Sequence, residues 1–265
     1  MTQSKAKSES SAMNIDDALF EYLLRLADDR LILGHRLSEW CGQGPILEED
    51  IAITNMALDY IGQATSLLEY AGEIENKGRS EDDIAFFRDT IDYRCLKITE
   101  LPRGDFGFTV ARQLLFSVFS YLLFNRLQKS EDKTLAGISA KAFKECRYHV
   151  RHSRKWTITL GDGTEESHTR IQNAFNELWR YTNELFYMDD VDELLLDNGI
   201  AADLNLIKPE WKQRITEVLD EGNISVPPDD QYMVDGSREG LHTEHLGYLL
   251  AEMQRLPRSY PDATW

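Results

Sequence analysis

One long segment of the chain lacks acidic residues. The sequence holds 46 Asp and Glu residues in 265, so 20 residues at that density would include about 3.5, yet none lies between Phe108 and Leu127. The only charged residues there are Arg112 and Arg126, near the two ends. Twenty residues form a helix of about 30 Å, and a helix that is apolar all round is buried inside a larger protein. The segment therefore predicts a core helix that supplies no carboxylate.

Cysteine is also scarce. Cys41, Cys95 and Cys146 match no zinc or redox motif, and their odd number gives no disulfide framework. This usage is typical of a reduced, intracellular protein. The longest apolar stretch, Leu114 to Phe124, is too short to span a bilayer. We therefore expect a cytoplasmic protein.

The start of the chain has no apolar core of the kind that a signal peptide needs. We interpret residues 1–14 as a disordered tail and residues 15–265 as a single domain. The net charge of −17 at pH 7 creates a field that repels phosphate groups. This balance argues against binding to nucleic acid and to anionic membrane surfaces.

Helical patterns dominate, and strand patterns are rare. In the first predicted helix an apolar stripe recurs at spacings of three, four and seven: Leu19, Tyr22, Leu23, Leu26, Leu33 and Leu37. Helices are expected at about 16–40, 48–71, 84–96, 108–127, 135–160 and 238–256. One further helix is expected to begin after a cap at Asp162. Residues 188–230 are expected to form short helical pieces that extend over the others. The sequence therefore predicts an all-α helical bundle with extra helices.

The cores of such bundles can hold two metal ions. Ferritin-like di-iron proteins take a Glu from each of two helices and Glu-x-x-His from each of the other two, because that spacing puts both groups on one helix face. At the matching positions the 48–71 helix has Tyr60 and Gln63, and the 135–160 helix has Cys146 and His149. Neither pair is Glu-x-x-His, so these positions are interpreted as a degenerate metal site.

Other carboxylates do not restore the predicted site. Glu39 is a possible ligand on the first helix, and the 108–127 helix offers none. Asp59 and Glu145 lie one step aside from the inward pairs and are expected to face a different direction. Because iron requires several oxygen donors together, we expect no metal and no catalytic residue on this chain.

Four segments, in this order, resemble the C-subunit family of bacterial phenylacetyl-CoA epoxidase: LILGHRLSEW, LDYIGQA, KECRYHVRHSRKWTITLGDGTEESH and LHTEHLGYLLAEMQRLP. The resemblance covers nearly all of residues 16–265 and is most specific at 160–168 and 242–250. It implies a ferritin-like fold without a working metal site.

The resemblance also implies partners and a reaction. The chain would be a non-catalytic structural subunit that pairs with a homologous A subunit, which keeps the Glu-x-x-His pairs and binds the di-iron centre. A reductase subunit would supply electrons from NADPH, and the complex would add one oxygen atom from O₂ across the ring of phenylacetyl-CoA in phenylacetate catabolism. This chain would carry no cofactor, and its self-association stays open.

Two other functions stay open. The chain could be a divergent ferritin-like di-iron oxygenase that acts alone, with ligands such as Glu39, Asp59 and Glu145. It could also be a helical adaptor without an oxygenase partner.

Two polar groups have alternative interpretations. His242 and His245 lie three residues apart, but two histidines are a weak zinc signal because zinc sites use three or four protein ligands. We interpret them as a polar helix start or a contact between subunits. A basic cluster is formed by Arg147, Arg151, His152, Arg154 and Lys155. It is interpreted as a solvated face paired with carboxylates, or alternatively as a contact for an acidic partner or for coenzyme A phosphates.

Overall fold

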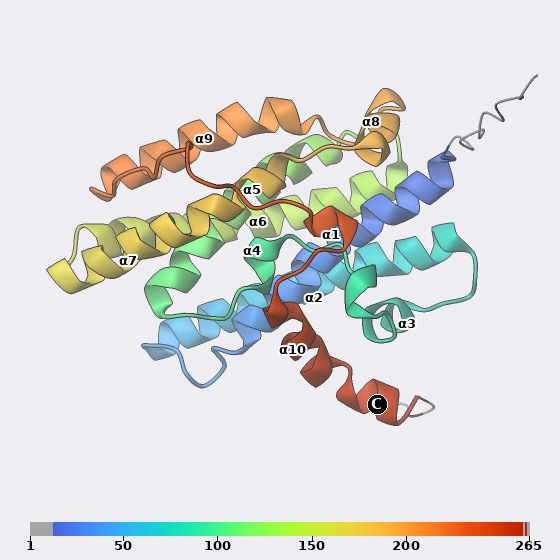
Figure 1. Cartoon of the computed structure of the whole chain (residues 1–265), viewed down its shortest axis with the longest axis horizontal. Helices are drawn as coiled ribbons and strands as arrows, with labels where there is room; N and C mark the ends of the chain where they lie inside the picture. The colour runs from blue at the N-terminus through green and yellow to red at the C-terminus, as the bar shows by residue number, and fades with distance from the viewer. Residues whose placement is uncertain (1–12, 262, 264–265) are drawn as a thin grey trace, which may run out of the picture.

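Four long helices form the centre of the fold (Figure 1): α1 (Ile15–Ser38), α2 (Leu47–Glu75), α5 (Phe106–Leu127) and α6 (Lys133–Gly161). The computed structural model describes residues 13–261 and 263, and within that part all regular structure is helical. α1 packs along α2, α5 packs along α6, and α2 meets α6. The expected all-α, ferritin-like bundle with extra helices is confirmed.

The expected tail lies mostly outside the described residues, which begin at Met13. Asn14 caps α1, because its side-chain oxygen accepts a hydrogen bond of 2.7 Å from the Asp17 N–H. The division into a tail and one domain stays a prediction.

Helix α5 is the core helix that the acid-free segment predicts. Asp105 caps it through a 2.8 Å bond from the Phe108 N–H. By length and composition α5 could cross a membrane, but 83% of its most apolar window is buried inside the protein. It packs against α6, α7 (Glu165–Leu178) and α9 (Leu204–Glu221). Its apolar surface therefore faces other helices.

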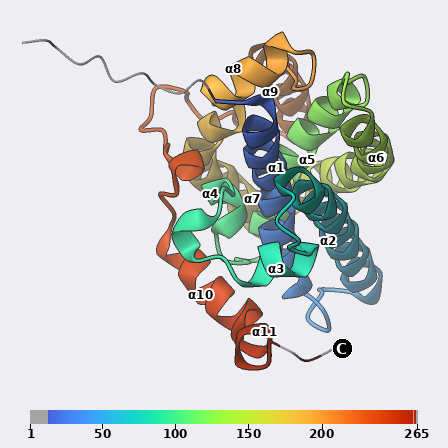
Figure 2. The ribbon, with the colours of Figure 1, turned by 90° about the vertical axis from the view of Figure 1, so that its right-hand side faces the viewer.

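Shorter helices cover the bundle: α3 (Glu81–Phe86), α4 (Lys97–Glu100), α8 (Asp190–Asp197), α10 (Glu244–Met253) and α11 (Arg255–Ser259). α10 and α11 project from one side of the bundle (Figure 2). The capping interpretation of Asp162 is wrong, because Thr164 caps α7 and Asp162 ends α6.

The predicted helix at 84–96 is wrong. α3 ends at Phe86, and most of the following segment is extended or turned up to α4. Two buried carboxylates of α1 account for the difference. Asp28 accepts a 2.8 Å bond from the Arg94 N–H, and Asp29 accepts one of 2.8 Å from the Leu96 N–H. These N–H groups are therefore bonded to side chains and not to a helix.

The prediction of short pieces at 188–230 is also wrong in part, because α9 is a regular helix of 18 residues. Pro209 lies inside it and cannot donate to the carbonyl of Asn205. Asn205 is exposed, so water can reach this end of the helix. Trp211 and Ile215 are buried and hold α9 on the bundle.

The predicted final helix at 238–256 is broken. A turn at Ser237–Glu239 is followed by Gly240 in the left-handed region, with φ of 81°. α10 then begins only at Glu244. The Thr243 N–H donates to the Glu100 carboxylate at 2.7 Å, which holds the chain in an extended form before the helix.

Candidate functional site in the bundle interior

The predicted inward pairs of α2 and α6 do face the bundle interior. Tyr60, Cys146 and His149 are fully buried, and Gln63 is nearly so. The rings of Tyr60 and His149 lie 4.8 Å apart. Burial raises the pKa of the Cys146 thiol to about 12, which keeps it protonated. The structure therefore brings these four side chains together, while their description as a degenerate metal site stays a prediction.

Helix α5 adds neutral polar groups to this interior. The Gln113 side chain donates to the Tyr60 hydroxyl at 2.7 Å. The Ser117 and Ser153 hydroxyls lie 3.2 Å apart. In a ferritin-like centre a helix in this position would supply a carboxylate. Here it supplies an amide and a hydroxyl.

Arg30 of α1 also lies in the bundle interior, and the sequence pattern did not predict this. Its side chain is fully buried, and its guanidinium lies over the rings of Phe124 at 4.4 Å and Phe116 at 5.7 Å. One N–H donates to the Leu26 carbonyl at 2.7 Å, and two other guanidinium nitrogens have no hydrogen-bond partner in the described structure. Burial lowers the pKa of Arg30, although Asp29, Cys146 and Tyr60 oppose this effect.

The guanidinium is thus close to the predicted inward pairs. Phe116, on which Arg30 stacks, also packs edge-on against Tyr60, with ring centres 5.8 Å apart. A signal for Arg30 was present in the sequence. It lies four residues after Leu26 and three before Leu33, so it belongs to the apolar stripe of the first helix.

Glu39, a possible ligand at a position of the predicted degenerate site, lies apart from this group. It follows the last residue of α1, nine residues beyond Arg30, which corresponds to about 13 Å along a helix. Its side chain is 38% exposed and pairs with Arg36 at 2.6 Å. The inward position of α1 is occupied by Arg30 instead.

Asp59 and Glu145 come closer to the interior than expected. Asp59 lies 2.9 Å from His149 Nε2, and Glu145 accepts a 2.8 Å bond from the Gln63 amide. Both carboxylates are half-buried at the edge between α2 and α6. Burial, with a contribution from Asp59, raises the pKa of Glu145. The expectation that they face elsewhere is therefore wrong, since each one binds an inward side chain.

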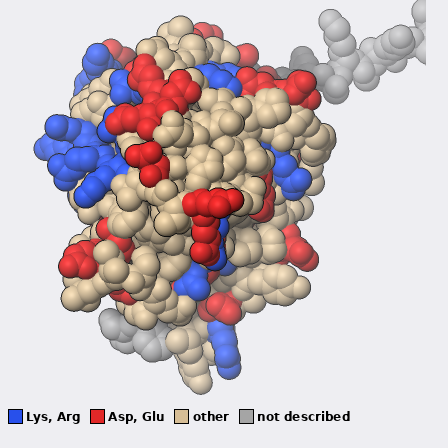
Figure 3. Space-filling view, turned by 90° about the vertical axis from the view of Figure 1, so that its left-hand side faces the viewer, with Lys and Arg blue, Asp and Glu red and all other residues tan. Residues whose placement is uncertain are grey.

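The basic cluster lies on the exposed face of α6. Arg154 forms an ion pair with Glu221, and Arg151 lies over the Tyr148 ring at 5.5 Å. Arg147 and Lys155 are exposed. Figure 3 shows Lys and Arg side chains gathered at one edge of a face where acidic side chains are more spread out. The paired-face interpretation is confirmed for Arg154, and contacts of the cluster with a partner stay a prediction.

His242 and His245 do not form a pair. His242 Nδ1 lies 2.6 Å from Glu100, whereas the backbone carbonyl of His245 accepts a 3.1 Å bond from Arg36. His242 precedes α10 and His245 lies in its first turn, which is where the polar helix start was expected.

Known proteins that are similar to this chain identify its family. The family model for phenylacetic acid catabolic proteins matches residues 1–265. The chain is 45% identical over 247 residues to the C component of 1,2-phenylacetyl-CoA epoxidase from Escherichia coli (strain K12). That match covers 93% of this chain and 99% of the relative. The chain therefore belongs to the family of phenylacetic acid catabolic proteins.

Proposed function

We propose that this chain is a non-catalytic structural subunit of a phenylacetyl-CoA epoxidase complex, where it pairs with and stabilises a di-iron A subunit. The name of the Escherichia coli relative supports membership in such a complex. The buried guanidinium of Arg30, close to Tyr60 and Cys146, is the observation that supports the non-catalytic role.

The residues of the interior do not fit a di-iron centre. Iron in ferritin-like proteins requires several carboxylate oxygens. The inward side chains here are a phenol, amides, a thiol and one imidazole. A buried guanidinium beside them would repel a metal cation. No step of the reaction is therefore assigned to this chain.

The chemistry in this proposal takes place on other subunits. The A subunit holds the iron, a reductase supplies electrons from NADPH, and this chain maintains the shape of its partner. The complex is proposed to act in the cytoplasm, without nucleic acid or membrane. An interior in which Tyr60, Gln63, Cys146 and His149 stand at the positions of metal-binding carboxylates avoids the unfavourable burial of like charges there, so it can pack as a scaffold.

Reconstitution of the complex tests this role. The A subunit and reductase are assayed for phenylacetyl-CoA oxidation with wild-type chain, with Cys146→Ser and without the chain. We expect turnover to depend on the chain and to stay within about twofold of wild type with the variant, whose thiol would play no chemical part. Loss of turnover in a variant complex that still assembles would contradict the non-catalytic role.

A divergent oxygenase that acts alone is the second candidate, and one observation favours it. Asp59 and Glu145 reach inward side chains from the edge between α2 and α6. Oxygen consumption by the purified chain with ferrous iron and a reductant separates the two functions. We expect the rate of the buffer control. If no metal-binding homologue co-purifies after co-expression, the adaptor function gains support instead.

A further inference from the structure

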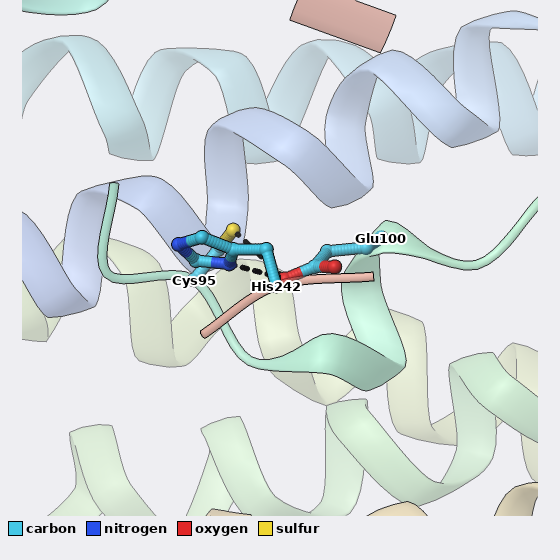
Figure 4. A group of neighbouring side chains, drawn as sticks. All are labelled: Cys95, Glu100 and His242. Carbon is cyan, nitrogen blue, oxygen red and sulfur yellow. Dashed lines mark hydrogen bonds and ion pairs between the residues drawn. The ribbon is translucent and has the colours of Figure 1, made fainter. Parts of the chain in front are cut away.

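A second group of side chains, outside the bundle interior, converges on one point. Cys95, Glu100 and His242 point toward one another (Figure 4), and their donor atoms all lie within 4.8 Å of one another. Cys95 Sγ is 3.7 Å from Glu100 Oε1, and His242 Nδ1 is 2.6 Å from the same oxygen. Cys95 precedes α4, Glu100 ends it, and His242 lies just before α10. The fold therefore joins two segments that are about 140 residues apart.

Further hydrogen bonds fix the orientation of the His242 and Glu100 side chains. His242 Nε2 lies 3.0 Å from the Tyr93 carbonyl oxygen. Glu100 Oε2 accepts bonds of 2.7 Å from both the N–H and the hydroxyl of Thr243. The remaining atoms, Nδ1 and Oε1, consequently face the thiol. Metal-binding histidines and carboxylates are held by outer hydrogen bonds of this type.

The Cys95 thiol of this group carries a proton that a metal ion can replace. Cys95 and Glu100 are fully buried. Burial, followed by the nearby Glu100 carboxylate, raises the pKa of the Cys95 thiol well above its ordinary value, so the thiol keeps its proton. Both ring nitrogens of His242 face oxygen atoms: Nδ1 faces the Glu100 carboxylate, and Nε2 faces the Tyr93 carbonyl.

We propose that Cys95, Glu100 and His242 bind one Zn²⁺ ion through a thiolate, a carboxylate and a neutral imidazole. The proton of the Cys95 thiol leaves on binding, because the thiolate and not the thiol is the metal ligand. Zn–S bonds of about 2.3 Å and Zn–O bonds of about 2.0 Å separate sulfur and oxygen in a tetrahedral site by about 3.5 Å. The observed 3.7 Å fits this spacing, and the 2.6 Å contact between Nδ1 and Oε1 widens on binding. Water takes the fourth position.

The ion would link the segment around α4 to the segment that leads into α10. Such a site lies outside the bundle interior and is independent of the proposed pairing with an A subunit. Zinc would therefore stabilise the C-terminal part of the chain without taking part in oxygen chemistry.

Cobalt substitution tests the site in the full-length chain. The metal-free protein is titrated with Co²⁺, and the near-ultraviolet band of thiolate-to-cobalt charge transfer is recorded. We expect one Co²⁺ per chain, displaced by one Zn²⁺, and a band that disappears in Cys95→Ser. The band should persist in Cys41→Ser, where the cysteine is exposed, and in Cys146→Ser, where it lies in the bundle interior.

Two further measurements keep the test independent of the folding of Cys95→Ser. Zinc binding by the wild type should release the proton of the Cys95 thiol, and His242→Gln should weaken zinc binding by at least about tenfold. If the wild-type chain binds neither Co²⁺ nor Zn²⁺ stoichiometrically, the proposal is overturned. His242 and Glu100 would then form an ion pair without a metal. A charge-transfer band that survives in a folded Cys95→Ser protein would also overturn it.

Discussion

Two regions of the molecule bury polar side chains in different ways. In the bundle interior, Arg30 has one backbone hydrogen bond and no carboxylate within ion-pair distance among the described residues. At the C-terminal seam, where α1 meets residues 88–100 and 235–254, Arg88 and Asp28 are buried together and joined by two hydrogen bonds. Arg238 likewise pairs with the buried Asp29, at 3.0 Å.

The seam contains four of the chain's buried carboxylates. Asp28, Asp29, Glu100 and Glu184 are all buried at the seam, where each accepts hydrogen bonds from other segments. The bundle interior contains amides, hydroxyls, a thiol and a guanidinium. Carboxylates thus connect segments at the seam, while among the described residues none is fully buried beside Tyr60 and His149, where a di-metal centre would need them.

The largest expected effect is at the seam. Asp28→Asn leaves the buried Arg88 guanidinium without its charged partner, so we expect the free energy of unfolding to fall by about 3–5 kcal/mol. Urea denaturation measures the change. The matched control is Glu221→Gln, which breaks the exposed pair with Arg154 and should change stability by less than about 1 kcal/mol. Equal losses in both variants would show that burial does not distinguish these pairs.

A large effect is also expected from apolar packing in the bundle interior. Tyr60→Ala removes a fully buried ring that packs against Phe116 and His149. The cavity and lost contacts should lower the free energy of unfolding by roughly 3 kcal/mol or more. Tyr60→Phe is the control and should lose less, because it keeps the ring and leaves only the Gln113 amide without its partner. A loss below about 1 kcal/mol in Tyr60→Ala would mean that the ring is not part of the core.

A smaller effect of opposite sign is expected at Arg30. Arg30→Met keeps most of the side-chain volume and removes a buried charge that lacks an ion pair. Stability should stay unchanged or rise by about 1–2 kcal/mol, because no desolvated guanidinium remains. Thermal and urea unfolding check this direction. A loss of more than about 2 kcal/mol would show that the guanidinium stabilises the interior and would remove the contrast with the seam.

The smallest effect concerns pH. Burial raises the pKa of Glu145, so the folded state keeps its proton at pH values where the unfolded chain has lost it. Stability contributed by this group is therefore present at low pH and declines as pH rises through the ordinary glutamate range to the raised pKa. Glu145→Gln should flatten that part of the stability profile, and Glu69→Gln, exposed on α2, should not. Identical slopes in all three proteins would contradict the assignment.

The sequence predicted the long helices and the burial of the inward pairs because helical periodicity reports directly on the faces of a bundle. It failed at 84–96 because side chains of α1 bind the N–H groups of Arg94 and Leu96, and local patterns do not contain such distant partners. The convergence of Cys95, Glu100 and His242 was missed for the same reason. Arg30 was within reach, since its spacing from Leu26 and Leu33 places it on the buried stripe.

Anaerobic loading with ferrous iron, followed by desalting, oxidation and Mössbauer spectroscopy, tests the central claim most directly. We expect no spin-coupled, oxygen-bridged pair of irons, because the interior of the bundle offers Arg30 and neutral polar groups in place of carboxylates. Two tightly bound irons per chain with the spectrum of a coupled pair would contradict it.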